Sequence, residues 1–384
     1  MKTKFKIFLL LSISCFFFAA TTSAYSVEKV IAKSFEASKG YTLSIENKYG
    51  SINVQEWDRN EISFEIKISA EAKKQQDAED RLNSINVEFK QSGKTVAAKT
   101  VFDPRYKSCN NCSFEIRYQV MVPKGINYVI DNMYGNVNIP NVEGNTNFVV
   151  KYGNLTTGNL SGSNTIDVKY GDYASLDITG ANNAIDVKYG KINIQKLMGQ
   201  KNTVTTSYGG NVYIGQTNIL NIDIKYSKLK IDSADELVVE SGYSNANIGK
   251  VTKLQVNSKY ENYTIGEVNE LNAYFGYSNV SIKKLNNSLK VSEIKYGKLN
   301  VDYVASHFSL MDVTAKYTNV NIKFDGAASY QADLYTKYGS INVPSGQFRR
   351  ASERDEERAN GTVGNSSIKS LVKIKNSYAN ITLK

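Results

Sequence analysis

The sequence predicts an all-β protein, a single-stranded parallel β-helix, from three observations. One short phrase, of which "NAIDVKYGKINI" is a clear copy, returns along most of the chain at near-constant spacing. Within each copy, apolar and polar residues alternate with a period of two, which is the period of a strand. The composition, with 26 Tyr and 26 Gly but only 4 Pro, favours strands joined by tight corners.

The first residues have the features of an export signal. Lys2, Lys4 and Lys6 precede an apolar run at residues 7–20, and small residues lead up to Ala24. We therefore expect residues 1–24 to be a signal peptide, and the mature chain to reach the periplasm, the outer-membrane surface or the medium. A lipoprotein anchored through Cys15 is the alternative, but the residues before Cys15 lack the usual Leu.

Residues 25–125 hold an early copy of the phrase, around Tyr49, followed by a long interruption. Within the interruption, the pattern predicts a strand at 61–70, one helix at 71–85, a hairpin at 85–102 and a closing strand at 113–125. A β-helix leaves unpaired strand edges at both ends. We therefore interpret this insert as a small α+β cap on the first coil.

The insert also contains Cys109 and Cys112 in the run "CNNC". In an exported chain a small structural disulfide is the favoured reading, and free thiols are the alternative. A zinc half-site lacks support because there is no second CxxC and the only His, His307, is distant in sequence.

Residues 126–384 are predicted to form the β-helix itself. The Tyr of each phrase marks a coil, and successive markers from Tyr134 to Tyr338 are 17–21 residues apart. Such self-similarity is typical of solenoids, in which each strand pairs with its counterpart one coil away. We expect about thirteen coils and a rod roughly 60 Å long. The markers are Tyr49, Tyr134, Tyr152, Tyr170, Tyr189, Tyr208, Tyr226, Tyr243, Tyr260, Tyr277, Tyr296, Tyr317, Tyr338 and Tyr378.

The marker shares the parity of the buried aliphatic residues and precedes a corner. We expect the tyrosines to stack as an aromatic ladder at the edge of the core, with a sugar-binding platform as the alternative. Tyr213, Tyr274 and Tyr335 have the outward parity and are better platform candidates. A Gly follows the marker in eight copies, which predicts a positive φ at that Gly. These glycines are Gly50, Gly135, Gly153, Gly171, Gly190, Gly209, Gly297 and Gly339.

Lysine precedes the marker in nine copies, and acidic residues recur two positions earlier on the same outward face. We expect two neighbouring columns that neutralise each other and keep the sheet from pairing with other sheets. The functional alternative is an anion-binding stripe. Its candidate residues, together with Tyr213, Tyr274 and Tyr335, are Lys151, Lys169, Lys188 and Lys225.

The repeat is interrupted again at residues 346–367, which are dense in charge and almost free of apolar residues. This segment is predicted to be an exposed loop. One copy of the phrase, around Tyr378, follows it. We expect the last coil to present an open edge through which two copies of the chain could associate.

The sequence holds no cluster that would indicate catalysis. Acidic and basic residues repeat evenly along the chain, and no nucleophile elbow or metal-ligand motif is present. We therefore expect no catalytic residues, no metal and no cofactor. The alternative is a carbohydrate-active β-helix enzyme, a lyase or hydrolase, with clustered acids in one groove.

The signal peptide, the early "ENKYGSINVQEWDRNEI", the helix-containing insert and the many "KYG" coils resemble the exported bacterial "putative adhesin" domain family. The resemblance covers nearly the whole mature chain. It implies a β-helix, usually right-handed, in a cell-envelope or surface protein of largely unknown function, and it brings no catalytic residues. The expected partners are surface polysaccharide or another envelope protein. Nucleic acid is not expected for an exported chain, despite a formal net charge of +10.

Overall fold

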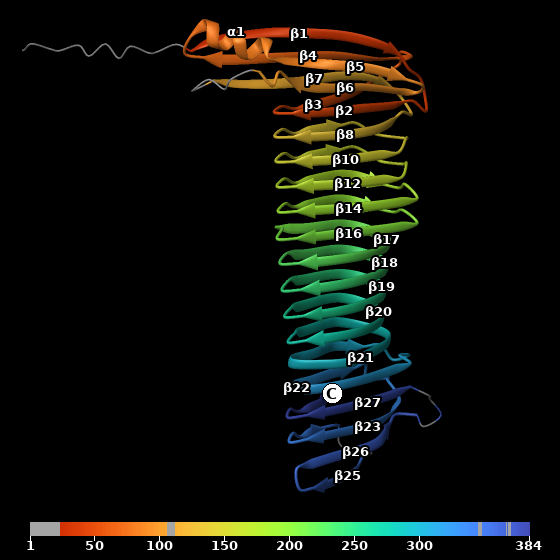
Figure 1. The fold of residues 1–384 in the computed structure, drawn as a ribbon. Coiled ribbons are helices and arrows are strands. Elements are labelled where there is room, and N and C mark those ends of the chain that lie inside the picture. Colours follow the sequence, from red (N-terminus) through yellow and green to blue (C-terminus); the bar gives the residue numbers. More distant parts are fainter. Residues whose placement is uncertain (1–23, 106–111, 345–347, 366, 368–369) are drawn as a thin grey trace, which may run out of the picture.

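Alternating side chains build the protein into a long rod of stacked strands. The structure is a computed structural model, which describes residues 24–105, 112–344, 348–365, 367 and 370–384. Strands hold 72% of the residues and helix 3%, so the predicted all-β class is confirmed. Figure 1 shows the coils stacked as a parallel β-solenoid beneath a wider N-terminal end.

The coil around Tyr189 shows how one phrase becomes two strands. β14 (Asn182–Lys188) and β15 (Ile192–Leu197) lie on either side of the corner. Their alternate residues, such as Ile185 and Ile192, point into the core and are almost completely buried. β14 pairs in parallel with the strand before it and the strand after it, so that like residues are neighbours in adjacent coils.

The other coils repeat this arrangement. Strands that end at the corner are β2 (Thr42–Lys48), β8 (Asn127–Met133), β10 (Thr146–Lys151), β12 (Asn164–Lys169), β16 (Lys201–Ser207), β23 (Tyr330–Lys337) and β27 (Leu371–Ser377). Strands that begin after it are β3 (Ile52–Trp57), β9 (Val137–Ile139), β11 (Leu155–Thr157), β13 (Tyr173–Ile178), β24 (Ile341–Asn342) and β28 (Ile381–Leu383). Longer strands continue around the opposite bend: β17 (Asn211–Lys225), β18 (Lys228–Gly242), β19 (Asn245–Lys259), β20 (Asn262–Gly276) and β21 (Asn279–Val304). β21 also runs through the corner at Tyr296, and β22 (Leu310–Phe324) runs through the corner at Tyr317.

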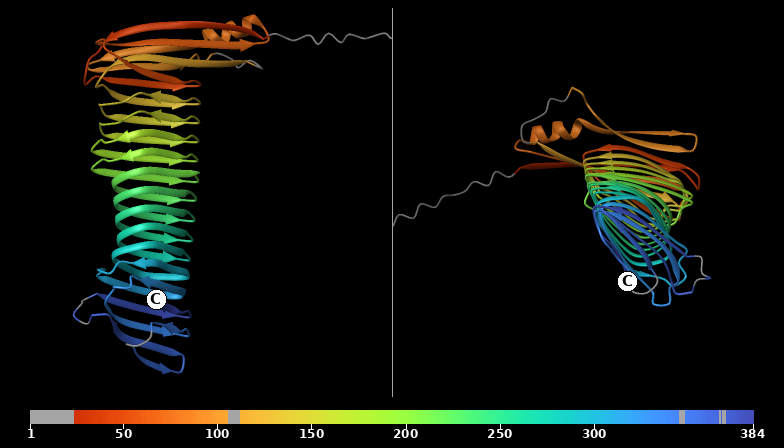
Figure 2. Two further views of the ribbon diagram at one scale, coloured as in Figure 1. Left: turned by 180° about the vertical axis from the view of Figure 1, so that it is seen from behind. Right: turned by 90° about the horizontal axis from the view of Figure 1, so that it is seen from below.

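The N-terminal cap comprises β1 (Tyr25–Glu36), β4 (Glu61–Ala72), α1 (Gln75–Asn83), β5 (Ile85–Ser92), β6 (Thr95–Phe102) and β7 (Ser113–Pro123). β7 extends one side of the rod, with β4 and then β1 added antiparallel, and the β5–β6 hairpin extends the other side. Helix α1 crosses the top and buries Ala78 and Leu82. The predicted α+β cap is therefore present. Figure 2 shows it projecting sideways from the rod.

The regular part of the solenoid makes about ten turns, fewer than the predicted thirteen coils. The last coils, moreover, do not stack in chain order. β27 lies between β22 and β23, and β28 lies between β22 and β24. The last coil of the chain is thus inserted into the stack, and the expectation that it forms an open end is wrong. The hand of the coil stays a prediction.

The far end of the rod is covered by the segment that was predicted to be an exposed loop. β25 (Phe348–Glu353) and β26 (Glu356–Val363) form an antiparallel hairpin, and β26 pairs antiparallel with β23. Pairing supplies the backbone hydrogen bonds of these strands, so the segment becomes sheet with few apolar side chains. The charged segment is therefore an end cap of the solenoid.

Candidate binding surface

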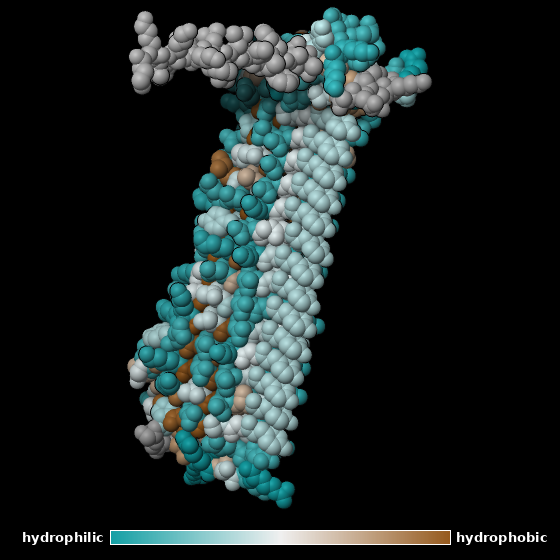
Figure 3. All heavy atoms as spheres, turned by 90° about the vertical axis from the view of Figure 1, so that its left-hand side faces the viewer, coloured by the Kyte–Doolittle hydropathy of each residue, from teal (hydrophilic) through white to brown (hydrophobic). Residues whose placement is uncertain are grey.

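Fourteen tyrosines form one continuous stack along one edge of the rod, which we call the tyrosine ladder. Successive rings have centroids 4.6–5.4 Å apart and planes within 18° of parallel. Each tyrosine remains 37–55% exposed. Figure 3 faces this edge and shows an unbroken band from the cap to the far end. The ladder consists of all fourteen markers, in the stacking order Tyr49, Tyr134, Tyr152, Tyr170, Tyr189, Tyr208, Tyr226, Tyr243, Tyr260, Tyr277, Tyr296, Tyr317, Tyr378 and Tyr338.

The corner takes its positive φ at the tyrosine, so the prediction of a positive φ at the following Gly is wrong. All fourteen ladder tyrosines have φ between 50° and 66°. This left-handed conformation costs a side chain about 1–2 kcal/mol, which stacking on both ring faces offsets. The next residue is Gly for another reason: a Cβ on Gly190 would lie 1.8 Å from the carbonyl oxygen of Gly171 in the neighbouring coil.

The upper end of the ladder is closed by the N-terminal cap. The ring of Tyr49 packs edge-on against Phe102 and Phe114, with centroids 6.0 Å and 5.2 Å away. The guanidinium of Arg81, from α1, lies 3.8 Å from the ring centroid of Phe114. The cap therefore fixes the first rung of the ladder as well as covering the core.

The geometry of the ladder limits what it can bind. An aromatic platform for sugars offers ring faces, but every ladder ring from Tyr134 to Tyr378 in the stack has both faces covered by its neighbours. What reaches solvent is ring edges and phenol hydroxyls. The ladder can therefore meet a flat or ridged partner along its length, with the hydroxyls donating and accepting hydrogen bonds.

The charged columns beside the ladder are paired at four coils, which agrees in part with the neutralisation that the sequence predicted. Salt bridges join Lys169 to Asp167 at 3.0 Å and Lys188 to Asp186 at 3.4 Å, and others join Lys225 to Asp223 and Lys295 to Glu293. The hydrogen bond from Lys169 to Asp167 raises the pKa of the lysine. Lys151, Lys169 and Lys188 are neighbours on adjacent coils, whereas Lys225 lies further along the rod.

The three outward tyrosines do not form one platform. Tyr274 and Tyr335 both stand three positions before a marker, in the acidic column but on different strands, and Tyr213 follows its corner on β17. The faces of two of the rings are partly covered by cations, since Lys230 lies 5.0 Å from the ring centroid of Tyr213 and Arg358 lies 5.0 Å from that of Tyr335. The hydroxyl of Tyr213 also donates a hydrogen bond of 2.6 Å to Asp232.

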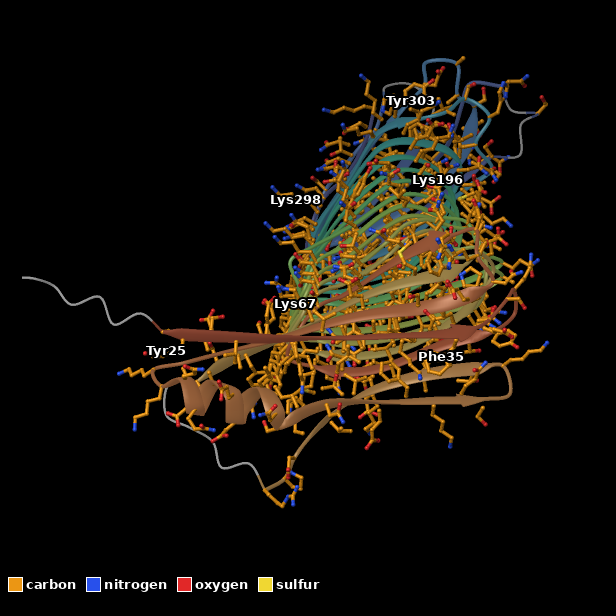
Figure 4. The ribbon with its side chains drawn as sticks, turned by 90° about the horizontal axis from the view of Figure 1, so that it is seen from above. Tyr25, Phe35, Lys67, Lys196, Lys298 and Tyr303 are labelled. Atoms are coloured by element: carbon orange, nitrogen blue, oxygen red, sulfur yellow. The ribbon has the colours of Figure 1, made fainter. Side chains whose placement is uncertain are left out.

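Two shallow hollows lie along the outer faces. One, of about 510 Å³, combines carboxylates and cations near the far end, and the other, of about 550 Å³, is richer in amides. The first is lined by Asp312, Asp333, Tyr335, Arg358, Lys373 and Lys375, among others, and the second includes Tyr213, Lys230, Asn245, Asn247, Asn262 and Thr264. Both open broadly to solvent and could hold part of an extended polar chain. Figure 4 looks along the rod and shows charged side chains, including that of Lys298, around its outside.

One carboxyl, that of Glu261, is buried although its place in the repeat predicts exposure to solvent. Glu261 stands in the corner position that Gly occupies in other coils, yet its side chain turns inward and the residue is only 3% exposed. Its Oε2 accepts a hydrogen bond of 2.7 Å from Ser241, and its Oε1 has no partner among the described residues. Burial raises the pKa of Glu261 to about 7. The sequence signal that could have pointed to this carboxyl is an acidic residue directly after a marker tyrosine, where most other coils have Gly or Ser.

Two further predictions concern residues that are partly outside the described segments. Residues 1–23 and Cys109 lie outside them, so the signal peptide and the pairing of Cys109 with Cys112 stay predictions. Cys112 itself is disulfide-bonded. Within the described residues, no three or more His, Cys, Asp or Glu side chains are grouped so that they could hold a metal ion. None of the described helices has the length and apolar character needed to cross a membrane.

No family model matches the chain, and no curated protein matches it. Among solved structures, it is similar to a "putative cell adhesion protein" from Clostridium sporogenes, with 9% identity over 93% of this chain and 99% of that chain and a TM-score of 0.18. It is also similar to a "putative adhesin" from Parabacteroides merdae, with 13% identity over 71% and 96% of the two chains and a TM-score of 0.27. A third structure, a "putative adhesin" from Bacteroides fragilis, has 13% identity over 77% and 97% of the two chains and a TM-score of 0.23. These names agree with the resemblance seen in the sequence, and similarity this distant carries no function over to the chain.

Proposed function

We propose that the chain is a non-enzymatic protein of the cell envelope or cell surface, an adhesin or scaffold that binds through its repetitive outer faces. The observation that carries the proposal is the distribution of its outward chemistry. Amides, hydroxyls and paired charges recur coil after coil, as in the asparagine pairs Asn53–Asn138 at 2.7 Å and Asn245–Asn262 at 3.0 Å. A partner that follows the rod meets the same groups about every 4.8 Å.

The partner that suits such a surface is an extended polar polymer, such as a surface polysaccharide, or another envelope protein. The lysines beside the ladder would contribute to binding mainly as hydrogen-bond donors. Because Lys169, Lys188 and Lys225 are already paired with carboxylates, they offer hydrogen-bond donors with little net positive charge. Export by the predicted signal peptide would bring the protein to such partners, and no cofactor is needed.

The test is a glycan-array screen with residues 25–384, followed by titration of any polysaccharide that binds. We expect Lys169→Gln alone to weaken binding less than about twofold, because many coils share the contact. The combined variant K151Q/K169Q/K188Q/K225Q should weaken it at least tenfold. A single substitution that abolishes binding would contradict the proposal of a distributed surface.

One observation favours a second candidate, a carbohydrate-active enzyme. Asp312 and Asp333 lie on either side of Lys373 in the register of β22, β27 and β23, and they line the same hollow. Two strand spacings place such residues roughly 9.6 Å apart, close to the upper limit for inverting glycosidases. Release of reducing ends or unsaturated products from acidic polysaccharides, abolished by D312N or D333N, would support this candidate over the first.

A further inference from the structure

The tyrosine ladder leaves more aromatic surface exposed than a solitary soluble protein normally does. A tyrosine that is half exposed presents about 100 Å² to solvent, so fourteen present about 1,400 Å² in one band. The largest apolar patch of a typical monomer is about 300–600 Å². A standard protein–protein interface buries about 800 Å² on each partner. Just over half of the band would therefore suffice for a stable contact.

The spacing of the ladder selects the kind of partner. Rungs at 4.6–5.4 Å repeat over about 60 Å, and a partner can contact every rung only if it has the same period. Sugar stacking is disfavoured because the ring faces are covered. The ladder of a second copy necessarily has the same period. Its phenol hydroxyls can also form hydrogen bonds with those of the first ladder. We propose that two copies of this chain associate side by side through their tyrosine ladders.

The flanking charges allow this contact. The lysines beside the ladder would repel their counterparts in a second copy if they were unpaired. At Lys169, Lys188, Lys225 and Lys295, however, a carboxylate lies within 2.8–3.4 Å of the ammonium group. At these four coils the carboxylate offsets the charge of the lysine, so the aromatic contact is not opposed by an unbroken row of uncompensated cations.

The N-terminal cap sets the relative direction of the two rods. Figure 1 shows α1 and the start of β1 projecting past the edge of the rod that carries the ladder. With the rods parallel, the two caps would meet at the same end and hold the ladders apart. With the rods antiparallel, each cap extends over the hairpin end of the other copy. The geometry therefore points to an antiparallel pair.

The first measurement is sedimentation velocity and small-angle scattering of residues 25–384 between about 1 and 200 μM. We expect a dimer with a larger cross-section than the monomer and nearly the same maximum dimension. Y189G/Y208G/Y226G keeps the left-handed corners, since Gly adopts positive φ freely, and should weaken association at least tenfold. Y189F/Y208F/Y226F keeps the rings and should retain the dimer. L176S/I219S removes exposed apolar groups that lie away from the ladder, and it should leave the association of the two copies unchanged.

Nitration of tyrosine by tetranitromethane provides a second measurement that does not depend on how well a variant folds. In the unsubstituted chain, Tyr189 and Tyr208 should become protected as concentration rises, whereas Tyr213, which lies on β17 outside both the ladder and the N-terminal cap, should not. A chain that stays monomeric at 200 μM, a dimer twice as long as the monomer, or an association unaffected by the Gly variant would overturn the proposal. Protection that needs added polysaccharide would also overturn it and would assign the band to that ligand. These outcomes are separate from the glycan screen, which can fail while the rods still pair.

Discussion

Tyr170 and Tyr189 stack with their ring centroids 4.7 Å apart and their planes 3° from parallel, although they belong to successive coils. The backbones of the same two coils are also joined beside the rings, since the amide of Tyr170 donates a hydrogen bond of 2.9 Å to the carbonyl of Lys188. Repeated along the rod, this relationship gives each corner two stabilising contacts. It explains why a bulky residue occupies a conformation that Gly adopts more readily.

Substitution of Tyr189 separates the stabilisation that comes from ring stacking from the cost of the left-handed backbone conformation. Tyr189→Ala loses both stacking contacts and keeps the left-handed strain, so we expect the free energy of unfolding to fall by about 2–3 kcal/mol. Tyr189→Gly loses the same contacts but relieves the strain, and it should be about 1 kcal/mol more stable than the Ala variant. Tyr189→Phe should change little. Urea unfolding followed by circular dichroism measures all three, and an Ala variant as stable as the Gly variant would show that the corner is not strained.

The glycine after the marker can be tested in the same way. In Gly171→Ala the new Cβ would lie 1.9 Å from the carbonyl oxygen of Gly153, so a coil must shift and stability should fall by about 2–4 kcal/mol. Gly242→Ala is the matched control, because no heavy atom lies within 4 Å of its added Cβ and its φ is not left-handed. We expect that variant to change stability by less than about 0.5 kcal/mol. Equal losses in the two variants would disprove the steric explanation.

The features that the sequence predicted correctly depend on parity and period alone. Alternation places Ile185 and Val187 inside and Asp186 and Lys188 outside, and the repeat length brings like residues together in adjacent coils. The aromatic ladder and the paired charges follow directly. The site of positive φ could not be predicted, because Tyr disfavours that conformation and is held there by the stack as a whole.

The far end of the rod could not be predicted for a different reason. The distance from Tyr338 to Tyr378 revealed an interruption, but not that Tyr378 would stack between Tyr317 and Tyr338. Nor did polar composition reveal the β25–β26 hairpin, because an edge hairpin is held by backbone pairing to β23 more than by apolar side chains. Glu261 was missed because an acid at a corner is expected to face solvent.

The arginines of β25 should protect the end of the rod from further pairing. Among the described strands β25 pairs only with β26, and Arg349 and Arg350 are exposed on it. Because charged side chains discourage strand addition at an edge, R349V/R350V should increase end-to-end association, seen as a concentration-dependent rise in the longest dimension by scattering. The control K73Q/K74Q removes the same charge beside α1 and should not lengthen the particles. If both variants behave alike, net charge rather than the edge strand is responsible.

Glu261 should make the stability of the solenoid depend on pH. Burial raises its pKa in the folded chain to about 7, above the ordinary value of 4.5. The folded state therefore holds the proton more tightly than the unfolded state does. The contribution of this carboxyl to stability is greatest below about pH 4.5 and decreases as pH rises towards 7, by on the order of 3 kcal/mol if the carboxyl stays buried.

Glu261→Gln removes this titration while keeping an inward polar group of the same size. Relative to the unsubstituted chain, the variant should be more stable at pH 8, and the difference should shrink or reverse at pH 4.5, as measured by urea unfolding at both pH values. Glu65→Gln, at an exposed carboxyl on β4, serves as the control, because water solvates either form of that side chain. A difference between Glu261→Gln and the parent that is the same at both pH values would mean that the carboxyl escapes to solvent. In that case the corner at Tyr260 must open more readily than the burial of the Glu261 side chain implies.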